Sequence, residues 1–190
     1  KLGIPVQKGH DPEHLAGHRA LVVSSAIPKD HPEVLRARAL GIEVVRRAEA
    51  LAEATAGGML IGIAGMYGKI IITVMTTEAL AAAGKAPTGV VGARVTAWGG
   101  NLSQGGHDVF VVEADEYDRS FLALYPTVAV VTNVEADHLD IYRDLQDIHE
   151  TFSEYVGRAR YVVLCADDAG ANRLASPATA EVIRYGITSP

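Results

Sequence analysis

The sequence lacks several features that would assign it to a class at once. It has one cysteine, Cys165, which excludes an internal disulfide and fits a reducing, cytoplasmic environment. It has no apolar stretch of the length that a membrane span requires, so we expect no membrane partner. It has no excess of basic residues: 17 Lys and Arg stand against 23 Asp and Glu, which argues against a nucleic-acid partner.

What remains is a chain of 190 residues that is 48% hydrophobic, enough for a packed core. Short apolar runs alternate with helical patterns along it, and this alternation favours a parallel sheet with helical crossovers. We predict strands at residues 19–26, 42–45, 59–64, 88–95, 107–113, 127–133, 161–165 and 181–185. We predict helices at residues 32–40, 47–56, 69–83 and 144–156, the first of them capped by Asp30.

The fold class that this order predicts is α/β, with a P-loop-type central domain that has a parallel sheet. A partial Rossmann-like domain would precede it. The Gly57-Gly58 pair interrupts the helical pattern, so we place the domain boundary there, between residues 1–57 and 58–190.

A glycine-cornered loop joins the strand at 59–64 to the helix at 69–83. Its sequence from Gly65 runs through Met66, Tyr67 and Gly68 to Lys69. Backbone N–H groups at a helix N-terminus face an anion in such loops, and a lysine adds a point charge, so the layout predicts a phosphate site. The loop lacks the Ser or Thr that should follow the lysine and hold magnesium, because the chain continues with three isoleucines from position 70 to 72.

Polar residues follow two further strands of the same domain. The run 113–116 comes after one strand and contains three carboxylates, and Asn133 and His138 come after the next. The carboxyl ends of parallel strands gather at one edge of a sheet, where ligands bind. Carboxylates suit Mg²⁺, and a lysine beside a cation suits phosphoryl transfer. Each feature also has a plainer interpretation: a strand-to-helix turn, solvated helix caps, or a surface histidine.

Three stretches resemble the Mur ligases of peptidoglycan synthesis: residues 62–69, residues 112–122 with their Glu-Ala-Asp-Glu-Tyr-Asp run, and residues 131–140. Residues 22–27 and 44–49 resemble the later part of the UDP-substrate domain of that family, so the resemblance spans nearly the whole chain. It implies an ATP-dependent, amide-forming ligase. The motifs most resemble the member that joins L-alanine to UDP-N-acetylmuramate through an acyl phosphate.

The resemblance also implies roles for residues. Lys69 would hold the β- and γ-phosphates of ATP within the loop 65–70. Glu113 and His138 would ligate Mg²⁺, and with Lys69 they form the expected catalytic set. Asn133 would line the same pocket, and Ser24 and Ser25 would lie near the UDP part of the substrate.

The loop departs from the family pattern. Where the family has Thr, His, Thr and Thr, this chain has Met66, Tyr67, Ile70 and Ile71. An isoleucine cannot coordinate a hard cation, so we expect weakened binding of ATP and Mg²⁺ and a chain that is inactive as it stands. We also expect the family's glycine-rich first turn to lie before Lys1, and its C-terminal domain to be absent.

Two alternatives stay open. The chain could be a non-catalytic α/β scaffold whose apolar loop packs against a partner. It could also belong with the murein-peptide recycling ligases, which carry the Glu-Ala-Asp-Glu-Tyr-Asp run as well. The residues from 119 to 122 and from 135 to 138 favour the alanine ligase over the recycling enzyme.

Overall fold

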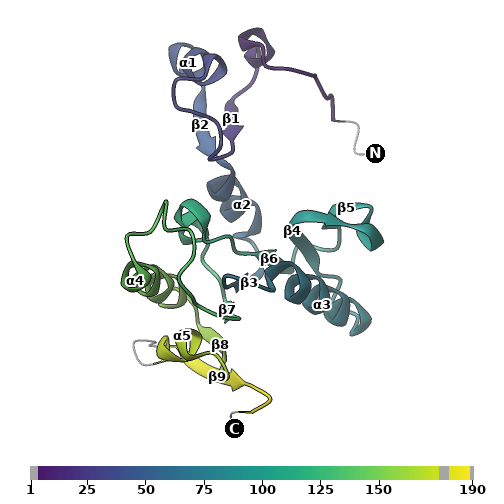
Figure 1. The fold of residues 1–190 in the computed structure, drawn as a ribbon. Helices are drawn as coiled ribbons and strands as arrows, with labels where there is room; N and C mark the ends of the chain where they lie inside the picture. Colours follow the sequence, from purple (N-terminus) through teal and green to yellow (C-terminus); the bar gives the residue numbers. More distant parts are fainter. Residues whose placement is uncertain (1–3, 176–179, 189–190) are drawn as a thin grey trace. The chain divides into compact units, whose positions relative to one another are not determined.

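A computed structural model describes residues 4–175 and 180–188 of the chain (Figure 1). The chain forms two compact units, Lys1–Ala50 and Leu51–Pro190, and the division falls inside helix α2 (Arg47–Thr55). Each unit is described by itself below. The functional boundary after residue 57 stays a prediction. In the described ranges, no helix is both long enough and apolar enough to cross a membrane.

The first unit is a small parallel β-α-β arrangement. A 3-10 turn, η1 (Pro12–Leu15), precedes strand β1 (Ala20–Val23), helix α1 (Pro32–Ala39) and strand β2 (Glu43–Arg46). The two strands pair in parallel from Ala20↔Glu43 to Val23↔Arg46. Its buried apolar residues in the described part are Leu15, Val34 and Ala37, so this unit has a sparse core.

Helix α1 begins one residue later than its predicted cap. Asp30 is not the cap, because the N-cap is His31, whose Nδ1 accepts a 3.3 Å hydrogen bond from the N–H of Glu33. Pro32 stands at the first helical position, where its fixed φ suits the helix and its missing N–H costs nothing. A proline at that position forces the residue before it into extended backbone, which makes that residue the cap.

The second unit is built on a seven-stranded sheet in the order β5-β4-β6-β3-β7-β8-β9. Its strands are β3 (Met59–Ala64), β4 (Thr88–Val95), β5 (Gly100–Ser103), β6 (Val109–Glu113), β7 (Val128–Val131), β8 (Tyr161–Cys165) and β9 (Glu181–Tyr185). Each neighbouring pair is parallel except β4 and β5. The predicted α/β class with a largely parallel sheet is confirmed, and β5 is an edge strand that the prediction missed.

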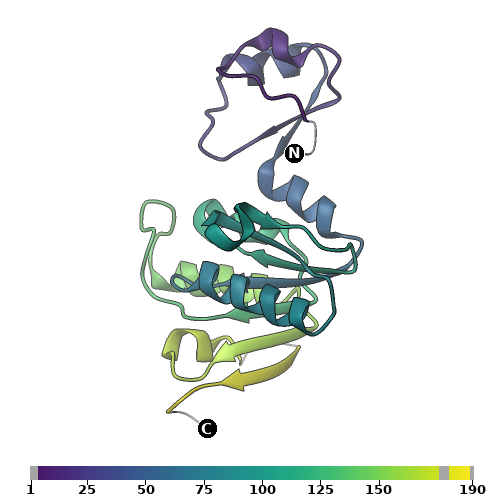
Figure 2. The same ribbon diagram turned by 90° about the vertical axis from the view of Figure 1, so that its right-hand side faces the viewer.

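Helices cover both faces of this sheet (Figures 1 and 2). On one face α3 (Lys69–Ala82) packs against β3, β4 and β6. On the other lie α4 (Leu145–Val156) and the 3-10 segment η3 (Tyr117–Ala123), whose aromatic rings meet where Phe121 stacks on Tyr155 at 4.6 Å between centroids. The helix α5 (Ala169–Arg173) and the 3-10 turn η2 (Thr96–Trp98) complete the elements.

Glycine lets the helix α4 approach the centre of the sheet. A side chain at Gly62 on β3 would collide with the hydroxyl of Tyr155, which is fully buried. The core of this unit includes Tyr155 and Phe152 of α4, and it also takes in Met66 at the start of the loop that leaves the end of β3.

Candidate active site

The loop between β3 and α3 owes its shape to two glycines. Gly65 has φ +133° and Gly68 has φ +84°, values in the left-handed region that favours glycine. A Cβ at Gly65 would collide with the Oγ1 of Thr132, which follows β7. The loop can therefore take this path against the neighbouring strand only with glycine at position 65.

The residues after β7 hold the loop by its main chain. The N–H of Tyr67 donates to Asn133 Oδ1 at 3.0 Å, and Asn133 Nδ2 donates back to the carbonyl of Tyr67 at 3.0 Å. Thr132 Oγ1 donates to the same carbonyl at 2.8 Å. Since these contacts use the backbone of Tyr67, they do not depend on which side chain stands at that position.

Helix α3 begins without a side-chain cap. Its N-cap is Gly68, which makes no side-chain cap hydrogen bond within the described residues, and the first turn contains no acidic residue. The first N–H groups of a helix have no partner within the helix, and this end carries the positive pole of the helix dipole. The geometry therefore suits an anion at this position.

Lys69 folds back over the loop. Its Nζ donates to the carbonyl of Gly65 at 2.8 Å and to that of Met66 at 3.4 Å, and it forms a 2.9 Å ion pair with Glu116 Oε1. Its side chain is only 12% exposed. The ammonium group is thus held at the mouth of the loop by two carbonyls and one carboxylate.

Glu116 is the residue of this site that sequence reasoning missed. Its side chain is 1% exposed, and His138 Nε2 lies 3.5 Å from its Oε1. Its other oxygen, Oε2, is buried and has no hydrogen-bond partner in the described residues. Burial raises the pKa of the Glu116 carboxyl, and the Lys69 ammonium opposes that shift. The one sign of Glu116 in the sequence was its position in the acidic run 113–116.

The structure brings some of the predicted residues together and not others. Lys69 and His138 both contact Glu116, and Asn133 contacts the loop. His138 has φ +51° and packs edge-on against the ring of Tyr117 at 5.2 Å.

Glu113 is engaged elsewhere. Its Oε2 accepts a 2.5 Å hydrogen bond from the N–H of Gly92 on β4. Among the described residues, no hydrogen bond or ion pair joins Glu113 to Lys69 or His138.

Ser24 and Ser25 lie in the first unit, just after β1. Both are exposed, and Ser24 Oγ accepts a 3.2 Å hydrogen bond from the N–H of Ala26. This contact makes the end of β1 a local turn.

The residues present suit a phosphate better than a magnesium ion held by the loop. The glycine path, the uncapped start of α3 and Lys69 are the parts that a phosphate needs. At the positions after the lysine, Ile70 is 36% exposed and Ile71 is 65% exposed, and neither offers an oxygen ligand. A cation here would depend on carboxylate or imidazole ligands from other strand ends.

Comparisons with known proteins indicate the same family for both parts of the chain. Residues 1–58 match the "Mur ligase family, catalytic domain" and residues 63–190 match the "Mur ligase middle domain". UDP-N-acetylmuramate–L-alanine ligase of Frankia alni is 43% identical over 201 residues, which cover 97% of this chain and 34% of the relative. The same enzyme of Rubrobacter xylanophilus is 43% identical over 189 residues, covering 98% of this chain and 42% of the relative.

Solved structures show the same fold. UDP-N-acetylmuramate–alanine ligase of Thermotoga maritima superposes with a TM-score of 0.85 at 24% identity, over 99% of this chain and 43% of that one. The UDP-N-acetylmuramate:L-alanyl-γ-D-glutamyl-meso-diaminopimelate ligase of Neisseria meningitides gives 0.79 at 25% identity, over 94% and 62%.

This chain spans well under half of the length of the two curated relatives. The middle-domain match alone covers more than half of the chain, and it includes the glycine loop, Glu116 and His138. The chain belongs to the Mur ligase family.

Proposed function

We propose that this chain forms the ATP-binding part, and some of the UDP-substrate part, of a ligase that joins L-alanine to UDP-N-acetylmuramate in peptidoglycan synthesis. The observation that carries the proposal is the glycine loop, held by Asn133 and Thr132, with Lys69 at the start of an uncapped helix. The two curated relatives, each 43% identical to this chain, bear the name of that ligase. The full activity belongs to the longer protein that these relatives represent.

In this proposal Lys69 exchanges its partners when ATP binds. Its ammonium leaves Glu116 or shares it, and contacts the β- and γ-phosphate oxygens beside the N–H groups of the loop. ATP would transfer its γ-phosphoryl group to the substrate carboxylate, which leaves ADP and an acyl phosphate. The amine of L-alanine would attack the carbonyl carbon of that acyl phosphate, lose a proton and release inorganic phosphate as the amide forms. The buried Glu116 keeps the lysine at the mouth of the loop in the free protein, so the cation is positioned in advance.

Magnesium ligation is proposed for Glu113 and His138, and Asn133 would line the same pocket. For this role Glu113 would use its Oε1, because its Oε2 accepts the hydrogen bond from the N–H of Gly92. The loop adds no hydroxyl ligand, since Ile70 stands where the family has threonine. We therefore propose that this chain binds Mg·ATP weakly and has little activity as it stands.

The first unit is proposed to help bind the UDP part of the substrate through Ser24 and Ser25. We propose that the boundary between the UDP-substrate domain and the ATP-binding domain lies after residue 57. A ligase that consumes ATP works in the cytoplasm, which we propose as the location of this protein.

Two other functions are each favoured by one observation. The exposed side chains of Tyr67, Ile71 and Met75 favour a scaffold whose apolar surface packs on a partner. The similarity in fold to the Neisseria ligase favours an enzyme that acts on a murein peptide.

Calorimetry with Mg·ATP tests the proposal on two chains: this one, and a variant with Met66→Thr, Tyr67→His, Ile70→Thr and Ile71→Thr. We expect the restored variant to bind at least about tenfold more tightly, which corresponds to about 1.4 kcal/mol. Ile183→Thr, an exposed isoleucine on β9, is the matched control and should not change the affinity.

Two outcomes would contradict the proposal. If neither chain binds Mg·ATP, the loop is not a phosphate site in this protein and the scaffold is favoured. If the original chain binds as tightly as the restored one, the isoleucines do not weaken the site. Adding Lys69→Met to the restored variant should abolish its tighter binding of Mg·ATP, because the lysine that contacts the phosphates is removed.

A further inference from the structure

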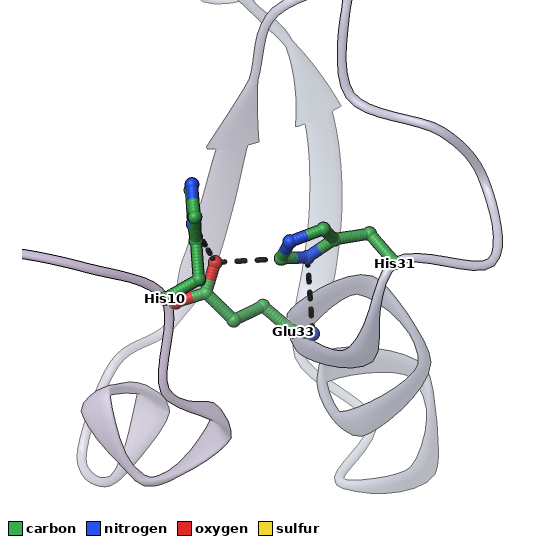
Figure 3. A group of neighbouring side chains, drawn as sticks. All are labelled: His10, His31 and Glu33. Carbon is green, nitrogen blue, oxygen red and sulfur yellow. Dashed lines mark hydrogen bonds and ion pairs between the residues drawn. The ribbon is translucent and has the colours of Figure 1, made fainter.

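The first unit contains a group of side chains that the proposed ligase function does not use. Among residues 4–175 and 180–188, His10, His31 and Glu33 are the one group of three histidine, cysteine or acidic residues that could hold a metal ion. Each offers one ligand atom, and these atoms all lie within 4.8 Å of one another. Figure 3 shows both imidazole rings turned toward the carboxylate.

The three residues converge because of the way α1 begins. His31 is the N-cap and Glu33 lies in the first turn, while His10 comes from the segment before η1. His10 Nδ1 lies 2.9 Å from Glu33 Oε2, and His31 Nδ1 lies 3.8 Å from the same oxygen. All three belong to one compact unit, so their spacing is a property of that unit alone.

These separations fit one small ion. Zn²⁺ lies about 2.0–2.1 Å from a histidine nitrogen and about 2.0–2.2 Å from a carboxylate oxygen, so two ligands at a tetrahedral angle are about 3.3 Å apart. The observed separations of 2.9 and 3.8 Å fall on either side of that value. The three ligand atoms lie within 4.8 Å of one another, so the two rings would have to turn toward each other to share one ion.

The surroundings orient the carboxylate. The N–H of Asp11 donates to Glu33 Oε1 at 3.1 Å, which leaves Oε2 for the two imidazoles. A third ring, that of His14, has its Nδ1 3.8 Å from Oε1. Glu33 and His31 are each 16% exposed, while His10 is 62% exposed, so an ion could enter from the His10 side. Contacts of this kind to metal ligands orient them and tune their affinity.

We propose that His10, His31 and Glu33 form a binding site for a divalent transition metal ion of the Zn²⁺ class. Two imidazoles and one carboxylate are a ligand set that zinc accepts with its fourth position open. Mg²⁺ and Ca²⁺ prefer oxygen ligands throughout, so the two nitrogens select against them. The ion would replace the long hydrogen bond between His31 Nδ1 and the N–H of Glu33.

The test is a titration of the chain with Zn²⁺ in competition with a chromophoric chelator. His10→Ala and His31→Asn should each weaken binding by at least about tenfold, because even residues that only orient a ligand contribute that much. His31→Asn is chosen because asparagine is a favoured N-cap, so the helix keeps its cap while the imidazole is lost. His18→Ala, an exposed histidine of the same unit, is the matched control.

The pattern across variants decides the outcome. Loss of binding in His10→Ala and His31→Asn, with His18→Ala unchanged and all circular dichroism spectra alike, supports the site. No binding by the original chain overturns it. Equal binding by all these variants overturns it too, and a loss confined to His138→Ala would show that Zn²⁺ binds at the other unit instead. None of these results depends on ATP.

Discussion

The two sides of the Lys69 loop are built in different ways. The polar side faces the strand ends, and its residues contact one another: Lys69, Glu116, Thr132, Asn133 and His138. The apolar side carries the exposed side chains of Tyr67, Ile70, Ile71 and Met75. The polar side holds the backbone of the loop through hydrogen bonds to Tyr67, while the side chains of the apolar side are exposed. The loop can therefore keep this backbone path whichever side chains stand on its apolar side.

The largest expected effect lies at the ion pair of the polar side. Lys69→Met should lower the free energy of unfolding by about 3 kcal/mol, because it leaves a buried carboxylate without its cation. Glu116 is 1% exposed, so water cannot replace the ammonium. Urea unfolding followed by circular dichroism measures the change.

Adding Glu116→Gln to Lys69→Met is the control for this prediction. The double variant should recover part of the lost stability, since no buried charge remains unpaired. A loss below about 1 kcal/mol in Lys69→Met would contradict the idea that the pair holds the polar side together. Such a small loss would mean that His138, 3.5 Å from Glu116 Oε1, compensates the buried carboxylate without the lysine.

A smaller effect is expected where Asn133 holds the loop. Asn133→Ala removes two hydrogen bonds to the backbone of Tyr67, each 3.0 Å long. At about 1 kcal/mol for each bond, the loss should be about 1–2 kcal/mol. Hydrogen exchange should show faster exchange of the Tyr67 amide. Asn101→Ala, at an exposed position on β5, is the matched control. Unchanged exchange at Tyr67 would show that Thr132 alone holds the loop.

The third prediction concerns pH and the segment that follows Glu116. Asp147 on α4 accepts a hydrogen bond from the N–H of Arg143 and one from the Arg119 guanidinium at 2.7 Å. These contacts lower the pKa of Asp147 to about 2. An unfolded aspartate titrates near pH 4, so the stabilisation is complete above that pH and is lost as pH falls from about 4 to 2.

Thermal unfolding of the original chain and of Asp147→Asn checks this. The difference in Tm should be full at pH 6 and should shrink steadily below pH 4. Asp108→Asn, an exposed aspartate before β6, serves as the control and should show no such trend. A difference for Asp147→Asn that is the same at pH 6 and pH 2.5 would mean that the charge of Asp147 does not tether Arg119.

The sequence predicts the core strands well and the contacts of the candidate site poorly. The predicted strands at 59–64, 88–95, 161–165 and 181–185 have the observed bounds, because apolar runs between turn residues carry a local signal. Edge strand β5 was missed because its four residues, Gly-Asn-Leu-Ser, contain a single apolar side chain and so give almost no strand signal.

The pairing of Lys69 with Glu116 was missed for a different reason. After Glu116 the backbone takes two left-handed residues, Asp118 at φ 52° and Arg119 at φ 54°. Neither is glycine, so no local pattern signals this turn. Arg119 then reaches Asp147, 28 residues further along the chain. The acidic run was visible in the sequence, but which of its carboxylates faces the lysine is decided by this tertiary contact.

The smallest expected effect is on the apolar side, and it tests the comparison most directly. Ile71→Ala should change the free energy of unfolding by no more than about 0.5 kcal/mol, as surface substitutions usually do. Ile71 is 65% exposed on α3, and alanine is the better helix former, which offsets the small area lost. Ile63→Ala on β3, where the isoleucine is fully buried, should cost about 2–5 kcal/mol in the same urea experiment. A loss above about 1 kcal/mol for Ile71→Ala would mean that the side chain is covered in solution. Sedimentation at several protein concentrations would then show whether a second copy of the chain covers it.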